Sequence, residues 1–193
     1  MKIFFTAVAT VIGAAAFFPY LKDIFSHKTK PHAYTWLIWT ITQGTAVVGI
    51  WYGGGGWGGL NLTAGTLLVA GVFFFSLRYG TKNITRSDTI ILITAFLAII
   101  VWWQLHQPLL AVLMVSVIDL LGYIPSFRKS YKEPWSETLI SWAAFVASDI
   151  FALLALSKYN LLTMTYIISI IIANFGLFIF CLFRRSFVSK PKP

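Results

Sequence analysis

Two aspartates lie deep inside apolar segments of this sequence. Asp119 is ten residues into the apolar run 109–127, and Asp149 is ten residues into the run 139–157. Ten helical residues rise about 15 Å, which is half the thickness of the hydrocarbon core of a bilayer. A charged carboxylate at that depth costs roughly 2.5–3.5 kcal/mol. Each carboxyl is therefore expected either to carry a proton or to face a water-filled cavity that supplies hydrogen-bond donors or a cation.

Two helical stripes combine aromatic and polar side chains, with each residue about one turn from the next. They are Trp36, Trp39 and Gln43 in one run, and Trp142, Phe145 and Asp149 in another. Residues at this spacing share one face of a helix. An aromatic face beside polar groups suits a sugar, a nucleoside or an amino acid, because a ring stacks on it while the polar edge finds donors. The alternative is that Trp36 and Trp142 are anchors at the membrane interface.

The composition indicates that membrane helices position these residues. Apolar residues make up 58% of the 193-residue chain and charged residues 11%, against roughly 45–50% and about 25% in globular proteins. A soluble chain of this length could not bury so much apolar surface in one core. Seven apolar runs, each near the ~20 residues that cross a bilayer, cover residues 3–20, 34–52, 62–79, 89–105, 109–127, 139–157 and 161–183. An alternative for the first run is a signal peptide, with Lys2 ahead of it and the small residues 14–16 as a cleavage site.

Basic residues fall almost entirely on one side of the expected membrane. Thirteen of the 15 lysines and arginines lie in the first, third and fifth loops or the C-terminal tail, and the others are Lys2 and Lys158. The positive-inside rule therefore places the N-terminus outside and the C-terminus in the cytoplasm, which accounts for the net charge of +9 without a nucleic-acid partner. The glycine-rich segment 53–61 is expected to be a flexible outer connection. Aromatic residues expected at the outer interface are Trp51, Tyr52, Trp57, Trp102 and Trp103.

The sequence also aligns with itself at an offset of 106 residues. This offset pairs Pro19 with Pro125 and Trp36 with Trp142, each at the same place in its apolar run. Because one further apolar run separates the two copies, both copies cross the membrane in the same direction. We therefore expect an all-α membrane protein of seven transmembrane helices in a 3+1+3 arrangement with parallel three-helix repeats. The expected units are residues 1–80 (first repeat), 81–106 (linker helix) and 107–193 (second repeat and cytoplasmic tail).

The same offset shows that the two acids have no acidic counterpart. Asp149 pairs with Gln43, which cannot titrate, and Asp119 pairs with Gly13. This asymmetry predicts a single ionisable site, for a proton, a cation or both, with Asp119 as an accessory group. The alternative is that both acids are neutral and form packing contacts by hydrogen-bonding across helices.

In topology, length and repeat organisation, the chain resembles the SWEET and PQ-loop superfamily of membrane transporters. Pro19-Tyr20 and Pro125-Ser126 lie where that family has a Pro-Gln pair, and the glutamine is replaced in both copies. The segment Ala173–Leu177 is similar to the family's Pro-Asn-x-x-Gly pocket motif, with alanine in place of proline and a shifted glycine. The resemblance implies alternating access, a substrate site that includes Asn174, and proton coupling at the position of Asp149.

The two prolines and the asparagine each have a simpler structural interpretation. Proline removes a helical hydrogen bond and clashes with the preceding turn, so it ends or bends a helix. Pro19 and Pro125 are therefore either helix ends at the interface or, as the resemblance implies, paired hinges of a cytoplasmic gate. Asn174 could equally be a residue that bonds a neighbouring helix.

The sequence thus predicts a transporter of a small polar solute, such as a sugar or an amino acid, with protons as a second partner. The expected substrate-binding residues are Trp36, Trp39, Gln43, Trp142, Asp149 and Asn174. Two alternatives are a PnuC-like facilitator of a vitamin or nucleoside, and a receptor or assembly protein that does not transport. Neither a Ser-His-Asp set nor an HExxH motif is present, so we expect no enzyme, no metal and no cofactor. The compact loops favour the bacterial inner membrane, with lipid as a partner, and leave a homo-oligomer open.

Overall fold

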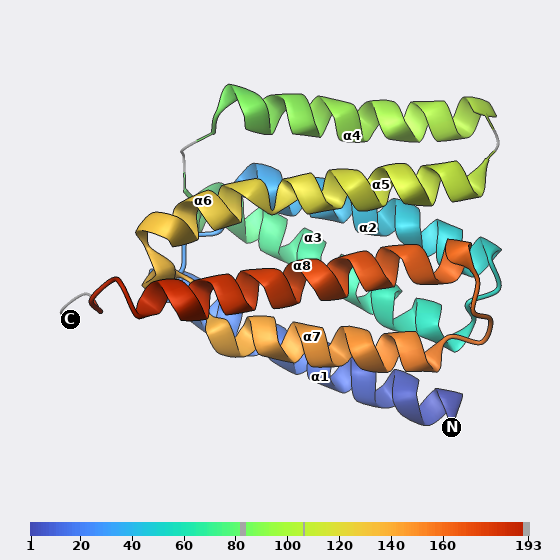
Figure 1. Cartoon of the computed structure of the whole chain (residues 1–193), viewed down its shortest axis with the longest axis horizontal. Helices are drawn as coiled ribbons and strands as arrows, with labels where there is room; N and C mark the ends of the chain where they lie inside the picture. Colours follow the sequence, from blue (N-terminus) through green and yellow to red (C-terminus); the bar gives the residue numbers. More distant parts are fainter. Residues whose placement is uncertain (82–83, 106, 191–193) are drawn as a thin grey trace.

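The chain folds into a bundle of long helices. A computed structural model describes residues 1–81, 84–105 and 107–190. Its helices are α1 (Lys2–Phe25), α2 (Ala33–Tyr52), α3 (Trp57–Tyr79), α4 (Arg86–Leu105), α5 (Pro108–Gly122), α6 (Ile124–Lys132), the 3-10 helix η1 (Pro134–Ser136), α7 (Leu139–Ala155) and α8 (Leu161–Arg185). Figure 1 shows the helices lying side by side, with the start of α1 and the end of α8 at opposite ends of the bundle.

All seven apolar runs predicted from the sequence are helical, which confirms the all-α prediction for the described residues. Four helical segments are long and apolar enough to cross a membrane, namely α1, α3, the stretch Pro108–Lys132 and α8. Helix α7 is apolar but 17 residues long. Large apolar side chains also cover the outside of the bundle, for example Leu67, Phe74 and Ile172. Such a surface is expected where lipid rather than water surrounds the protein.

The two prolines lie in different backbone settings. Helix α1 continues past Pro19 to Phe25, so the interpretation of Pro19 as a helix end is wrong. The fifth run, in contrast, is interrupted, because α5 ends at Gly122 and α6 begins at Ile124. At this break the Tyr123 N–H bonds the carbonyl three residues earlier, at 3.1 Å, instead of the one four residues earlier. Pro125, in the first turn of α6, has no N–H with which to continue the α5 ladder.

The helices pack in one bundle with α4 at one edge. Helix α3 contacts both α1 and α2, and α8 contacts both α5 and α7. Helix α1 also lies against α7, and α2 lies against α5. Helix α4 packs on α5 and α2 (Figure 1). Helix α1 also contributes Phe17 and Tyr20 to the main apolar core.

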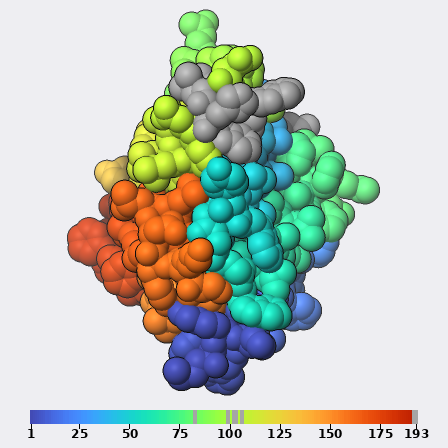
Figure 2. Space-filling model, turned by 90° about the vertical axis from the view of Figure 1, so that its right-hand side faces the viewer, coloured from blue at the N-terminus to red at the C-terminus, as the bar shows by residue number. Residues whose placement is uncertain are grey.

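One end of the bundle, which we call the glycine end, is closed by two connections packed together. They are residues 53–56, between α2 and α3, and residues 156–160, between α7 and α8. The Ser157 N–H donates to the Gly55 carbonyl at 3.0 Å, and the Asn160 side-chain amide donates to the Gly53 carbonyl at 3.2 Å. Figure 2 shows this end of the molecule, where the cyan and orange segments lie side by side.

The glycine-rich segment is not the flexible connection that its composition predicts. Residues 57–61 already belong to α3, and the preceding turn packs tightly on the opposite connection. A Cβ at Gly58 would lie 2.8 Å from Cδ2 and 3.1 Å from the backbone nitrogen of Leu156, so a larger residue would push the two connections apart. Gly56 has φ of +57°, a conformation that glycine adopts without strain. The glycines therefore serve close packing here.

The opposite end, which we call the basic end, contains the loop 26–32, helix α6, η1 and the segment after α8. Most of the lysines and arginines lie there, although Lys82 and Lys192 are outside the described residues. Near the glycine end, Trp51, Tyr52 and Trp57 are exposed, in agreement with an interfacial position. The side chains of Trp102 and Trp103, expected at the same level, are outside the described part of the structure.

Candidate functional site

A cavity lies in the middle of the bundle, lined by residues of α1, α2, α3, α7 and α8. All six residues predicted to bind a substrate line it: Trp36, Trp39, Gln43, Trp142, Asp149 and Asn174. They come from α2, α7 and α8, and further lining residues come from α1 and α3. The volume of the cavity is about 80 Å³, which is room for about six water molecules. The structure thus brings together residues that lie up to 138 positions apart in the sequence.

Three tryptophans form an aromatic wall of this cavity. The ring centroids of Trp36 and Trp39 are 5.2 Å apart, and those of Trp39 and Trp142 are 6.2 Å apart. All three side chains are buried, with 2–3% exposure. The alternative interpretation of Trp36 and Trp142 as interfacial anchors is therefore wrong, because an anchor exposes its ring to the headgroup region.

A chain of hydrogen bonds connects the acidic side of the cavity to the break between α5 and α6. The Asn174 amide donates from Nδ2 to Oδ2 of Asp149 at 2.8 Å. The Oδ1 of Asn174 accepts a hydrogen bond of 2.6 Å from the hydroxyl of Tyr123, the residue between α5 and α6. Asn174 therefore bonds neighbouring helices, as its simpler interpretation predicts, and it also lines the cavity, whereas its place in a substrate site stays a prediction. Sequence reasoning missed Tyr123, and its place two residues before Pro125 was the available signal.

Two amide side chains face the cavity without a protein partner. Gln43 and Asn61 both line it, and neither makes a side-chain hydrogen bond to any described residue. Asn61 is 8% exposed. Amides at this depth usually find a partner, because an unsatisfied polar group costs about 1–3 kcal/mol. A bound solute or ordered water would supply the missing partners. Asn61 was missed because the glycines before it suggested a loop.

Asp119 is buried beside the cavity and does not line it. Its Oδ1 accepts hydrogen bonds from the Thr42 hydroxyl and, at 2.8 Å, from the Tyr166 hydroxyl. These bonds tie α5 to α2 and α8. The contacts match the interpretation of Asp119 as a packing contact across helices. The structure does not bring Asp119 to the solute cavity, so its accessory role stays a prediction.

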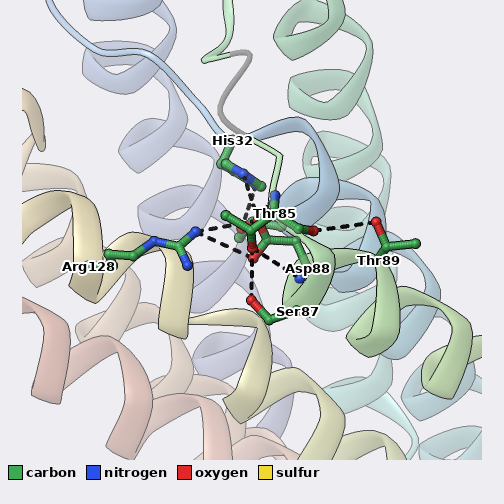
Figure 3. A network of polar contacts seen from close by, with 7 residues as sticks. His32, Thr85, Ser87, Asp88, Thr89 and Arg128 are labelled. Carbon is green, nitrogen blue, oxygen red and sulfur yellow. Dashed lines mark hydrogen bonds and ion pairs between the residues drawn. The ribbon is translucent and has the colours of Figure 1, made fainter.

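At the basic end, the buried carboxylate of Asp88 joins three helices (Figure 3). Asp88 is in the first turn of α4, and its Oδ2 accepts a bond of 2.8 Å from the Thr85 N–H. The same oxygen lies 3.5 Å from His32 Nε2, ahead of α2, and 3.4 Å from the Arg128 guanidinium on α6. Burial raises the pKa of Asp88, but the Thr85 hydrogen bonds, His32 and Arg128 together outweigh it, so the pKa lies below the ordinary 3.8.

Replacing this carboxylate is expected to destabilise the protein in a pH-dependent way. Because the folded state lowers the pKa, the stabilisation is complete above about pH 4 and is lost as the pH falls through the folded value. Asp88→Asn should therefore lower the unfolding free energy by roughly 1–2 kcal/mol between pH 5 and 8. The difference from wild type should shrink below pH 4. Thermal melts in detergent across this range measure it, with the exposed Glu133→Gln as a control that should match wild type.

A second buried acid, Glu137, links the basic end to the cavity wall. Its Oε1 lies 2.5 Å from Lys129 Nζ, and its Oε2 accepts a bond of 3.0 Å from Trp142 Nε1. Sequence reasoning missed Asp88 and Glu137 because the charges at this end were attributed to topology alone. The segment from Thr85 to Asp88 carried a signal, since a threonine three residues before an acid is typical of a helix start.

Comparisons with protein-family models, with curated proteins and with solved structures find no match to this chain. The functional argument therefore depends on the geometry of the chain itself.

Proposed function

We propose that this chain is an integral membrane transporter of a small polar solute, which binds in the central cavity. The observation that carries the proposal is the convergence of six residues on one cavity. Five of them were predicted from depth and helix face and Asn174 from the resemblance, and together they combine an aromatic wall with an acid and two amides. Sites for small solutes have this composition, with apolar walls and a few polar groups that fix orientation.

The helix bounds support the further proposal that the chain consists of two three-helix units related by a two-fold axis along the membrane normal. Shifting α1 and α3 by 106 residues gives 108–131 and 163–185, beside Pro108–Lys132 and Leu161–Arg185. Under the same shift, the contact between α1 and α7 corresponds to the contact between α5 and α2. Binding at the interface of two repeats is typical of transporters built from repeats.

A pair of matched contacts supports the same relation and shows how the units differ. At the contact between α2 and α5, Asp119 accepts a bond from Thr42, and the residues 106 positions away are Gly13 in α1 and Ser148 in α7. A Cβ at Gly13 would lie 2.7 Å from Ser148 Oγ, so α1 and α7 approach closely there. Ser148 instead donates to the Ala9 carbonyl at 2.8 Å. The hydrogen bond between α2 and α5 thus corresponds to a close approach of α1 and α7.

The proposed mechanism is alternating access with the hinge at the break between α5 and α6. The glycine end is closed by its two packed connections, and α6 is tied at the basic end to Asp88 and Glu137. Tyr123 sits at the break and bonds Asn174, which bonds Asp149. A proton or a cationic solute group at Asp149 would change this chain of hydrogen bonds. The change would favour one position of α6 over another. Pro19, inside a continuous α1, has no such break beside it, so the hinge is asymmetric.

The three tryptophans favour a second candidate within the same class, a facilitator of a vitamin or nucleoside, such as PnuC. Trp36, Trp39 and Trp142 offer ring faces on which a planar heterocycle could stack. A cavity of about 80 Å³ is smaller than the roughly 300–1,000 Å³ of typical ligand sites. Both candidates therefore require a wider cavity in another state of the transport cycle, and the nucleoside requires the larger widening.

A ligand screen by thermal stability tests the proposed function. Purified protein in detergent would be melted with sugars, amino acids, nucleosides and vitamins at acidic and neutral pH. A ligand that binds only the folded state should stabilise it by about 2.7 kcal/mol at 100 times its Kd, and Gln43→Leu should weaken that effect. If no solute of any class stabilises the protein, while a pulled-down peptide does, the transporter proposal is wrong and a receptor is favoured.

A further inference from the structure

A second hollow lies at the basic end, apart from the central cavity. Its volume is about 580 Å³, and it shares no lining residue with the central cavity. The loop 26–32, helix α6 and the residues around η1 bound it. We call it the basic cleft.

The basic cleft carries more positive charge than its acidic neighbours neutralise. Its lining includes one acid, Glu133, and five bases: Lys28, Lys30, Arg128, Lys129 and Lys132. Arg128 and Lys129 are ion-paired with buried acids. Among the described residues, the other three lysines have no carboxylate within ion-pair distance. All three are exposed and converge on the cleft from two segments of the chain.

A buried hydroxyl faces the same cleft. Ser126, in the first turn of α6, is 8% exposed, lines the cleft and makes no side-chain hydrogen bond to any described residue. The start of α2 also lies at the cleft, because its N-cap residue, His32, is part of the lining. A helix N-terminus favours a nearby anion. A donor hydroxyl, a helix start and three lysines together form a site for a negatively charged oxygen group.

We propose that the basic cleft binds a phosphate-bearing anion, supplied either by the headgroup of an anionic phospholipid or by a free phosphate compound. The flexible ammonium groups of Lys28, Lys30 and Lys132 would neutralise the phosphate, and the Ser126 hydroxyl would donate to one of its oxygens. The volume exceeds that of a phosphate ion, so a glycerol or similar group attached to the phosphate fits as well. The positive-inside rule explains bases at this end in general, and it does not explain their convergence on one hollow.

The test measures binding of two probes to the full-length protein in detergent. Dioctanoyl phosphatidylglycerol tests the lipid source and inorganic phosphate tests the soluble source, with dioctanoyl phosphatidylcholine as the neutral lipid. The variant Lys28→Gln/Lys30→Gln/Lys132→Gln removes the unpaired lysines. The matched control Lys22→Gln/Arg78→Gln/Arg86→Gln removes the same charge from residues that do not line the cleft. Each base near a phosphate contributes about fivefold in affinity, so the cleft variant should bind about 100-fold more weakly.

The outcomes distinguish binding at the basic cleft from non-specific attraction of an anion to the positively charged protein. If the cleft variant loses phosphatidylglycerol but the control variant keeps it, and inorganic phosphate binds weakly to all, the ligand is a lipid headgroup. If inorganic phosphate shows the same difference between variants, the ligand is a free phosphate compound. Ser126→Ala, which keeps all three lysines, should then lower the affinity for that probe several-fold. Equal binding by the two triple variants, or no binding of either probe by wild type, would overturn the proposal.

Discussion

Asp149→Asn is expected to abolish the pH dependence of solute binding while leaving the protein folded. Asp149 lines the cavity and accepts a bond from Asn174, and an asparagine oxygen can accept the same bond. The substitution therefore resembles a permanently protonated carboxyl. In the wild type, solute binding that requires one proton should weaken about tenfold per pH unit once the carboxyl ionises. The affinity of the Asp149→Asn variant should stay constant from pH 5 to 8, as measured with whichever solute the ligand screen identifies.

The second intramembrane acid supplies the matched control for this experiment. Asp119 is equally buried but lies off the cavity, where it accepts bonds from Thr42 and Tyr166. Asp119→Asn should keep the pH dependence of the wild type, since its contacts are structural. In proteoliposomes, an inward proton gradient should stimulate uptake by wild type and Asp119→Asn but not by Asp149→Asn. If Asp119→Asn alone flattens the pH profile, the proton site has been assigned to the wrong carboxyl.

The sequence predicted residues that line the cavity because helical geometry determines two features of a residue, namely its depth in the membrane and the direction in which its side chain faces. Depth follows from the position in an apolar run, and the facing direction follows from a period of 3.6 residues. Trp36, Trp39 and Gln43 satisfied both conditions, and so did Trp142 and Asp149. The internal offset then matched the stripe that begins at Trp36 to the stripe that begins at Trp142. These residues line one cavity, at the depth that both stripes share.

The features that sequence reasoning missed depend on contacts between distant segments. Asn61 followed a run of glycines, and composition could not show that those glycines pack against Leu156 rather than forming a loop. The break at Tyr123 was missed because residues 109–127 were treated as one continuous helix, although Gly122 and Pro125 lie on either side of Tyr123. Asp88 and Glu137 were overlooked because the positive-inside rule counts lysines and arginines on each side of the membrane. It does not show which of them form ion pairs with a particular acid. In each case the missing information is which segment lies opposite.

Trp142→Ala is expected to give the largest loss of stability in the chain. Trp142 is 2% exposed in the main core, packs against Trp39 and Phe145, and donates to Glu137. Removing a buried tryptophan costs about 3–5 kcal/mol in soluble proteins. We expect the lower figure, roughly 3 kcal/mol, because detergent also shelters apolar surface in the unfolded state. The thermal midpoint should fall by about 6–12 °C.

Two matched variants separate the causes of this loss. Trp142→Phe keeps most of the ring packing and removes the donor to Glu137, whose other oxygen still contacts Lys129, so it should cost about 1 kcal/mol. Trp57→Ala deletes the same side chain from an exposed position and should change stability by less than about 0.5 kcal/mol. Solute affinity should follow a different order, because binding depends on the ring face that lines the cavity. Trp142→Phe should retain part of the solute affinity, and Trp142→Ala should lose it. If the Trp142→Ala protein melts at the same temperature as the wild type, the ring is not part of a packed wall.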